Sequence, residues 1–167
     1  LNDIVTASAT ASALSHRMLA SYAVNQWYKI VSYDISQAVL QGVMLKDIQS
    51  RGENKRKIYF DPPADAWNIL YEVLPERFQI LHEANSDKEV TLEAIKGVYW
   101  LSDAPRLWRQ RFHEWMLKQD FKQSKFDECC YYKKIVKGAH KCKLIVIMHV
   151  DDCEAVGNGS DIKTFKK

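Results

Sequence analysis

LIVIMHVDD, residues 144–152, is an apolar run that ends in two adjacent carboxylates, Asp151 and Asp152. A continuous run of aliphatic and β-branched residues predicts a strand in the core of a sheet. Carboxylates at the end of a core strand cost free energy unless their charge is compensated. A divalent cation such as Mg²⁺ prefers oxygen ligands and compensates both charges at once. The stretch therefore predicts a metal site at the turn of a β-hairpin.

The residues around this run predict further antiparallel strands. Residues 129–136 favour a strand, residues 137–140 a turn, and residues 143–150 the return strand. Beyond the Asp pair, residues 153–156 predict the next strand, which Gly157 and Gly159 interrupt. Ser160 or Asp161 can cap a last helix. This half of the chain therefore predicts consecutive hairpins.

The first two thirds of the chain alternate between helical and strand patterns. Residues 1–14 are small and polar and predict an irregular lead-in, and Ser15 can cap a helix that ends near Asn25. The patterns that follow predict a strand at 28–33, a helical turn at 36–40 closed by Gly42, a charged loop at 46–57, a short strand at 58–60, a helix at 64–74, a strand at 90–95 and a helix from Pro105 to about Gln119. We see no repeat and no linker, and therefore expect one domain over residues 1–167.

The bulk composition is that of a globular protein. Of 167 residues, 47% are hydrophobic and 27% are charged, and the net charge of +3 is compatible with a polyanionic partner. No apolar run reaches about 18 residues, so we expect no membrane span. The start of the chain lacks a signal peptide and an initiator Met, which favours a fragment of a longer protein. The four cysteines lack metal-ligand spacing and predict reduced thiols in an intracellular protein, cytoplasmic or nuclear.

A third aspartate, like the Asp pair, stands at the end of a predicted strand. Asp34 comes at the end of the predicted strand at 28–33, so two neighbouring strands would bring Asp34, Asp151 and Asp152 together. Such a set could bind two Mg²⁺ ions and support phosphoryl transfer. Because successive strand residues point to opposite faces, the adjacent pair can serve one site only if the chain turns there. An Asp pair is also typical of a plain turn, so an α+β domain without a metal site stays an alternative.

Four segments in order resemble the reverse transcriptase of copia-type LTR retrotransposons. They are YDISQAVLQG at 33–42, similar to D-V-x-x-A-F-L-x-G; IYFDPP at 58–63, similar to I-Y-M-x-x-P; KGVYWLSDAPRLW at 96–108, similar to K-S-L-Y-G-L-K-Q-A-P-R-x-W; and HVDD at 149–152, similar to Y-V-D-D. The third segment continues through Phe121, Ser124 and Asp127. The resemblance covers residues 15–167.

The resemblance implies a palm-like antiparallel β-sheet backed by helices, with the fingers and thumb incomplete. It implies an RNA-directed DNA polymerase that uses primer, template and dNTP. Asp34, Asp151 and Asp152 would be the catalytic ligands of Mg²⁺ or Mn²⁺. The nucleotide-binding positions would be Ile35, Ser36, Gln37, Val39 and Asp103.

Four substitutions depart from the family pattern. Val39 replaces an aromatic residue that excludes ribonucleotides, and Asp103 replaces a Gln that can donate hydrogen bonds to a triphosphate. Trp100 replaces a Gly where the backbone can require positive φ, and His149 replaces a Tyr. We therefore expect a preserved metal site with weak or no primer extension by the isolated chain.

A non-catalytic nucleic-acid-binding remnant of a retrotransposon is the other alternative. Arg106 and Arg109 are its candidate nucleic-acid contacts, with Lys118 and the run at 55–57 as further cations. For the run at 55–57, simple solubility is the explanation that we favour over a nucleic-acid contact. The oligomeric state does not follow from the sequence.

Overall fold

The computed structural model of the chain is an α+β fold that describes residues 6–49, 57–77, 79, 91–137 and 140–165. The chain divides into two compact units. The sheet unit combines Leu1–Met44 with Lys96–Lys167, and the inserted unit is Leu45–Ile95. The prediction of one domain over the full chain stays a prediction.

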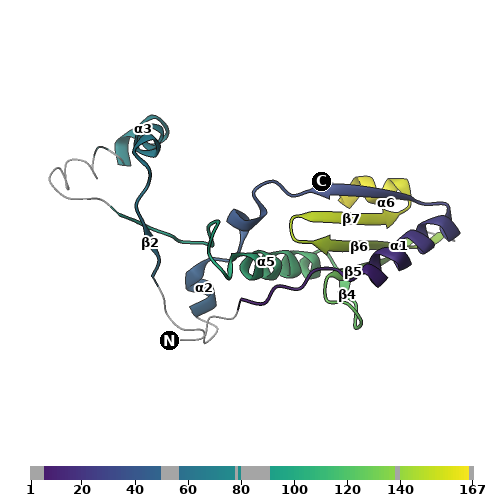
Figure 1. The fold of residues 1–167 in the computed structure, drawn as a ribbon. Coiled ribbons are helices and arrows are strands. Elements are labelled where there is room, and N and C mark those ends of the chain that lie inside the picture. Colours follow the sequence, from purple (N-terminus) through teal and green to yellow (C-terminus); the bar gives the residue numbers. More distant parts are fainter. Residues whose placement is uncertain (1–5, 50–56, 78, 80–90, 138–139, 166–167) are drawn as a thin grey trace. The chain divides into compact units, whose positions relative to one another are not determined.

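An antiparallel sheet is the centre of the sheet unit, as the sequence predicts (Figure 1). Its strands lie in the order β1-β7-β6-β5-β4. Their bounds are Lys29–Asp34 for β1, Lys122–Gln123 for β4, Cys130–Lys137 for β5, His140–His149 for β6 and Asp152–Gly157 for β7. The predicted hairpins are β5–β6 and β6–β7, and β1 pairs with β7. This last pairing joins segments far apart in the sequence.

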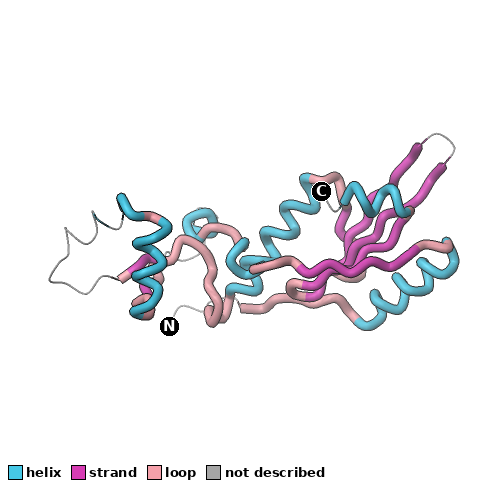
Figure 2. The backbone as a smooth tube through the Cα atoms, turned by 90° about the horizontal axis from the view of Figure 1, so that it is seen from above, coloured by secondary structure: helices cyan, strands magenta, loops and turns pink. Residues whose placement is uncertain are grey.

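Helices cover both faces of this sheet. Figure 2 shows α1 (Ala13–Gln26) on one side of the strands and α5 (Ala104–Lys118) with α6 (Gly159–Phe165) on the other. The 3₁₀ helix η1 (Ala38–Gln41) follows β1 and ends at Gly42, as predicted. The fold is therefore an antiparallel sheet backed by helices.

The core lies between α5 and the sheet. Pro105 stands in the first turn of α5, as predicted. Trp108, Phe112 and Met116 are buried at helical spacing, whereas Trp115 keeps 37% of its surface exposed. They pack in one apolar cluster with strand residues that include Tyr131, Val146 and Ala155. The predicted stripe is thus a core stripe with one ring left open to solvent.

The inserted unit consists of short elements. They are α2 (Leu45–Gln49), β2 (Tyr59–Phe60), α3 (Ala64–Val73) and β3 (Leu92–Glu93), with β2 paired to β3. The prediction of a loop from residue 46 was wrong at α2, because Leu45 and Ile48 are buried at i, i+3 spacing inside the charged run. The rest of that loop, 50–56, lies outside the described residues. The strand predicted at 90–95 is shorter than expected, and residue 90 also lies outside them.

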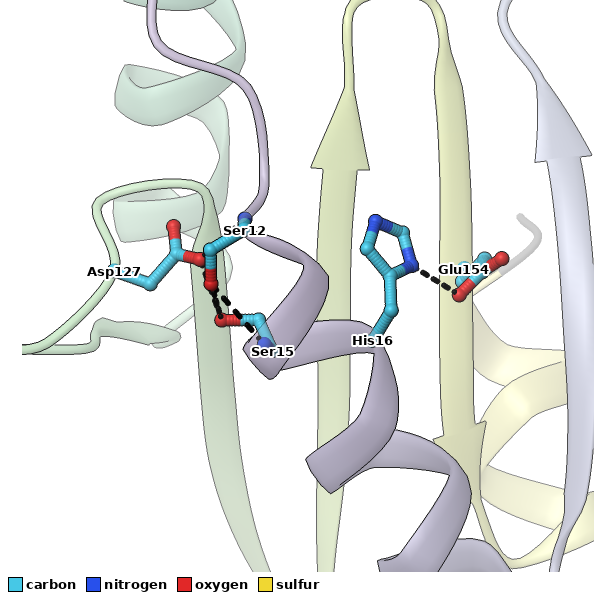
Figure 3. A network of polar contacts seen from close by, with 5 residues as sticks. All are labelled: Ser12, Ser15, His16, Asp127 and Glu154. Carbon is cyan, nitrogen blue, oxygen red and sulfur yellow. Dashed lines mark hydrogen bonds and ion pairs between the residues drawn. The ribbon is translucent and has the colours of Figure 1, made fainter.

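The start of α1 differs from the prediction in a way that only the tertiary structure explains. Ser12, not Ser15, is the N-cap, and its side chain accepts a hydrogen bond from the Ser15 N–H. The Ser15 hydroxyl instead donates to Asp127, which also accepts from the Ser12 N–H at 2.9 Å (Figure 3). The long-range partner therefore decides which serine caps the helix.

All four cysteines are free thiols, and three of them are buried. Burial raises the pKa of Cys129 to about 11 and that of Cys153 to about 12. Among the described helices, none combines the length and the apolar character that a membrane crossing requires.

Candidate metal centre

The β1–β7 register places two of the predicted carboxylates opposite each other. Asp34 and Asp152 are Cα partners at the last pair of this ladder. Directly opposite residues of antiparallel strands have Cβ atoms about 5 Å apart on one face of the sheet. Beside them, the Ile35 N–H donates to the Asp151 carbonyl oxygen at 3.0 Å. The backbone therefore brings the strand end at Asp34 to the hairpin that carries the Asp pair.

The chain turns at the Asp pair, as a shared site requires. His149 and Asp152 are the last partners of β6 and β7, so Val150 and Asp151 form a two-residue turn. Val150 has a φ of 58°, a conformation that a β-branched residue rarely adopts. Strained backbone of this kind occurs preferentially at functional sites.

A tryptophan of α5 holds this turn. The Trp108 indole N–H donates to the Val150 carbonyl oxygen at 2.7 Å. The sequence places Trp108 in a core stripe, and its polar contact with the turn is not evident from the spacing. This hydrogen bond thus joins the segment at 96–108 to the segment at 149–152, two of the four that carry the resemblance.

The folded chain does not bury the three carboxylates. Asp34, Asp151 and Asp152 are all exposed, so their charges are hydrated and pay no burial cost. The remaining electrostatic cost is repulsion, because like charges directly opposite in a sheet destabilise it. A cation would relieve the repulsion between Asp34 and Asp152.

Two histidines line the cavity beside Asp152. The cavity has a volume of about 400 Å³ and is bounded by His16, Ile147, His149, Asp152 and Glu154. His16 Nδ1 lies 3.0 Å from Glu154 Oε2 (Figure 3). The His16 and His149 rings meet edge to face, with their centroids 6.3 Å apart. His16 and Glu154 were not singled out from the sequence, because the α1–β7 contact that joins them is long-range.

The predicted nucleotide-binding residues fall into two places. Ile35, Ser36, Gln37 and Val39 lie in and before η1, where the Gln41 amide donates to the Ser36 carbonyl at 2.8 Å. Asp103 is 1% exposed and forms the N-cap position of α5.

Both predicted nucleic-acid contacts lie near acidic side chains. Arg106 lies 3.8 Å from Asp103, and Arg109 lies 2.8 Å from Glu128. In the inserted unit, Lys57 lies 3.9 Å from Glu93, whereas Lys55 and Arg56 are outside the described residues. The positive φ expected at the Trp100 position is present at 75°, and the side chain is fully exposed.

A ready-made metal cluster is absent from the part of the chain that the structure describes: no three His, Cys, Asp or Glu residues are grouped as a metal ion would need. The donor set suits a hard cation such as Mg²⁺ or Mn²⁺, which prefers carboxylate oxygens. A bound cation would therefore have to draw the exposed carboxylates together.

Comparison with known proteins gives a partial match. No family model matches the chain, and no solved structure matches it. The chain is 28% identical over 88 residues to the retrovirus-related Pol polyprotein from transposon TNT 1-94 of Nicotiana tabacum. The match covers 53% of this chain and 6% of that polyprotein. It supports an origin in a retrotransposon Pol polyprotein.

Proposed function

We propose that the sheet unit is the metal-binding palm of a reverse transcriptase, descended from an active RNA-directed DNA polymerase of a copia-type retrotransposon. The observation that carries the proposal is the Asp34–Asp152 pair across β1 and β7, with Asp151 in the strained turn beside it. The similarity to a Pol polyprotein supports the same origin.

Asp34, Asp151 and Asp152 would hold Mg²⁺ or Mn²⁺. Bound cations would supply activation of a primer 3′-hydroxyl and charge stabilisation for the leaving pyrophosphate. The chain's own contribution is placement: the Ile35–Asp151 hydrogen bond and the Trp108–Val150 hydrogen bond fix the turn relative to β1 and α5. Rigid strand ends are well suited to positioning such groups.

Turnover by this chain is expected to be poor. Val39 is a small residue where the family has an aromatic ring, so discrimination against ribonucleotides should be weak. Asp103 is buried beside Arg106 and offers no amide donor for a triphosphate. Primer–template RNA or DNA and dNTP are the partners that the proposal requires.

Cation-dependent melting tests the metal site. Asp34→Asn removes the repulsion with Asp152, so at low ionic strength without divalent cations this variant should melt above the wild type. Adding MgCl₂ or MnCl₂ should raise the Tm of the wild type and not that of Asp34→Asn, because a ligand of the folded state stabilises it. Asp61→Asn makes the same charge change at an exposed site in the inserted unit and should keep the cation response.

Equal cation responses in wild type and Asp34→Asn would reject the site. Primer extension tests the activity separately, on a primed RNA template with Mg²⁺ or Mn²⁺. Extension should be slight or absent. Robust extension by the wild type that is lost in Asp151→Asn would contradict the expected low turnover. It would not contradict the proposed metal site.

Polyanion binding without catalysis is a second candidate function. Lys134 and Lys143 are exposed and directly opposite each other on β5 and β6. Like charges in this position destabilise a sheet, and a bound phosphate backbone would relieve the repulsion. The affinity for a primed duplex should fall with salt on a log–log plot, and a Lys134→Gln/Lys143→Gln chain should show a shallower slope. A flat plot for the wild type would exclude this function.

A further inference from the structure

A second cavity lies on the opposite face of the sheet from α1. It has a volume of about 430 Å³ and is lined from β1, η1, α5, β7 and α6 of the sheet unit. Volumes of this size are typical of small-molecule sites. Tyr33 and Cys153, which are Cα partners and therefore share a face, both line it.

The wall of this cavity is a row of aromatic rings. Trp108 and Phe112 have ring centroids 5.8 Å apart, Phe112 and Trp115 are 6.2 Å apart, and Trp115 and Phe165 are 5.7 Å apart. Trp108 and Phe112 are almost fully buried, whereas Trp115 is 37% exposed. The row therefore has a fixed base and one ring with free surface for a planar ligand.

An arginine side chain lies beside these rings. Arg111 lines the cavity together with Trp108 and Trp115, which lie three residues before it and four residues after it on the same face of α5. Arg106 and Arg109 on the same helix have acidic partners at 3.8 and 2.8 Å. Arg111 is exposed and has no ion pair among the described residues. An arginine in an aromatic stripe thus offers its guanidinium to the cavity.

We propose that this cavity binds a planar aromatic compound that carries a single carboxylate. The ring would pack against Trp115 and Phe112, and the carboxylate would pair with the Arg111 guanidinium, whose planar fork matches it. Asp34 borders the cavity at the end of β1, where the strand leaves the sheet, and its charge disfavours a ligand with a second carboxylate, so a monoanion is favoured. The site does not depend on the proposed polymerase function, because it needs neither a metal nor a nucleic acid.

Calorimetric titration with three indole probes tests the proposal. Indole-3-acetate should bind more tightly than neutral indole, and tryptamine should bind most weakly. Arg111→Gln should lower the affinity for indole-3-acetate about tenfold, to that of neutral indole, because a charge-assisted hydrogen bond is lost. Trp115→Ala should weaken both indole-3-acetate and indole, with far-UV circular dichroism confirming that the variant is folded.

Lys125→Gln is the matched control, because Lys125 is exposed, outside the cavity and of the same charge. It should leave the affinity for indole-3-acetate within about twofold of the wild type. Equal losses in Lys125→Gln and Arg111→Gln would overturn the assignment, since net charge would then be the cause. Absence of indole-3-acetate binding, or tighter binding of tryptamine, would overturn it as well.

Discussion

Val150 holds a backbone conformation that its side chain opposes. Its φ of 58° at the β6–β7 turn is one that glycine adopts without steric cost. Val150→Gly should therefore raise the free energy of unfolding by about 1 kcal/mol, which corresponds to about 2–4 °C in Tm for a chain of this size. Thermal melting followed by circular dichroism measures the change.

Val136→Gly is the control for that substitution. Val136 is exposed within β5 and has no positive φ, so glycine there only adds backbone freedom and should lower the Tm. A fall in Tm for both variants would show that the Val150 turn stores no strain.

Asp127 ties the start of α1 to the loop before β5, and this contact predicts a pH dependence. Burial alone would raise the pKa of the Asp127 carboxyl, but hydrogen bonds from Ser15, Ser12 and Cys129 outweigh it and hold the pKa below its ordinary value. A lowered folded-state pKa gives stability that is present above the unfolded pKa, about 4, and is lost as the pH falls through the folded pKa. Urea denaturation should show Asp127→Asn less stable than the wild type by about 1–2 kcal/mol at pH 7, with a smaller difference at pH 3.

Asp120→Asn provides the comparison for Asp127→Asn. The Asp120 side chain is 88% exposed and lies 3.7 Å from Lys133, and Asn tolerates its positive φ of 60°. An exposed ion pair contributes little, so this variant should match the wild type at both pH values. A pH-independent deficit in Asp127→Asn would contradict the assigned pKa shift.

Sequence reasoning found the residues of the candidate centre but not the contacts that position them. The alternating pattern of β1 and the apolar run of β6 were enough to place Asp34 and Asp152 at strand ends. The Trp108–Val150 hydrogen bond and the His16–Glu154 pair were not predictable, because each joins residues at least 42 positions apart. Such pairings depend on the strand order and the helix packing, which local patterns do not specify.

Helices and strands were predictable from the sequence where local patterns determine them, and were missed where they do not. The positions of α3, α5 and the β5–β6 hairpin agree with their sequence patterns, because capping, periodicity and turn residues act locally. In contrast, the residues of α2 whose burial is described include two buried positions in a charged run, so the pattern is too short to recognise. The exposed face of Trp115 was also missed, since periodicity cannot tell a covered ring from one that borders a cavity.

The short helix α6 depends on its last described residue. The Phe165 ring lies 5.8 Å from Tyr33, 5.7 Å from Trp115 and 5.7 Å from Phe121. Phe165→Ala should lower the free energy of unfolding by about 2–3 kcal/mol, which is less than the roughly 3–5 kcal/mol of a core aromatic truncation because Phe165 is only partly buried. Hydrogen exchange should quicken most in α6.

Phe126→Ala serves as the matched truncation. The Phe126 side chain is 99% exposed, so its removal should leave the free energy of unfolding within about 0.5 kcal/mol of the wild type. Similar losses from both truncations would mean that the ring contacts of Phe165 do not hold α6 in place.

The division into a sheet unit and an inserted unit has no counterpart in the composition of the chain. No run of glycine, proline or serine marks Leu45 or Ile95, and the sequence therefore predicts a continuous domain. The structural basis of the boundary is a backbone contact. Met44 and Lys96 form an antiparallel β-bridge, so the chain leaves the sheet unit and returns to it at neighbouring positions.

This geometry predicts that the sheet unit folds without the inserted unit. Opposite residues of an antiparallel pair lie about 5 Å apart, a span that a two-residue Asn-Gly turn closes. Replacing residues 45–95 by Asn-Gly should leave a chain that melts cooperatively, with a Tm within about 5 °C of the main transition of the intact chain. The described residues of the inserted unit bury few side chains, so the intact chain should show an earlier, weaker transition that the shortened chain lacks. A shortened chain without near-ultraviolet circular dichroism would show that the sheet needs the inserted unit to pack. Retained melting together with a retained cation response would place the candidate metal centre wholly within the sheet unit.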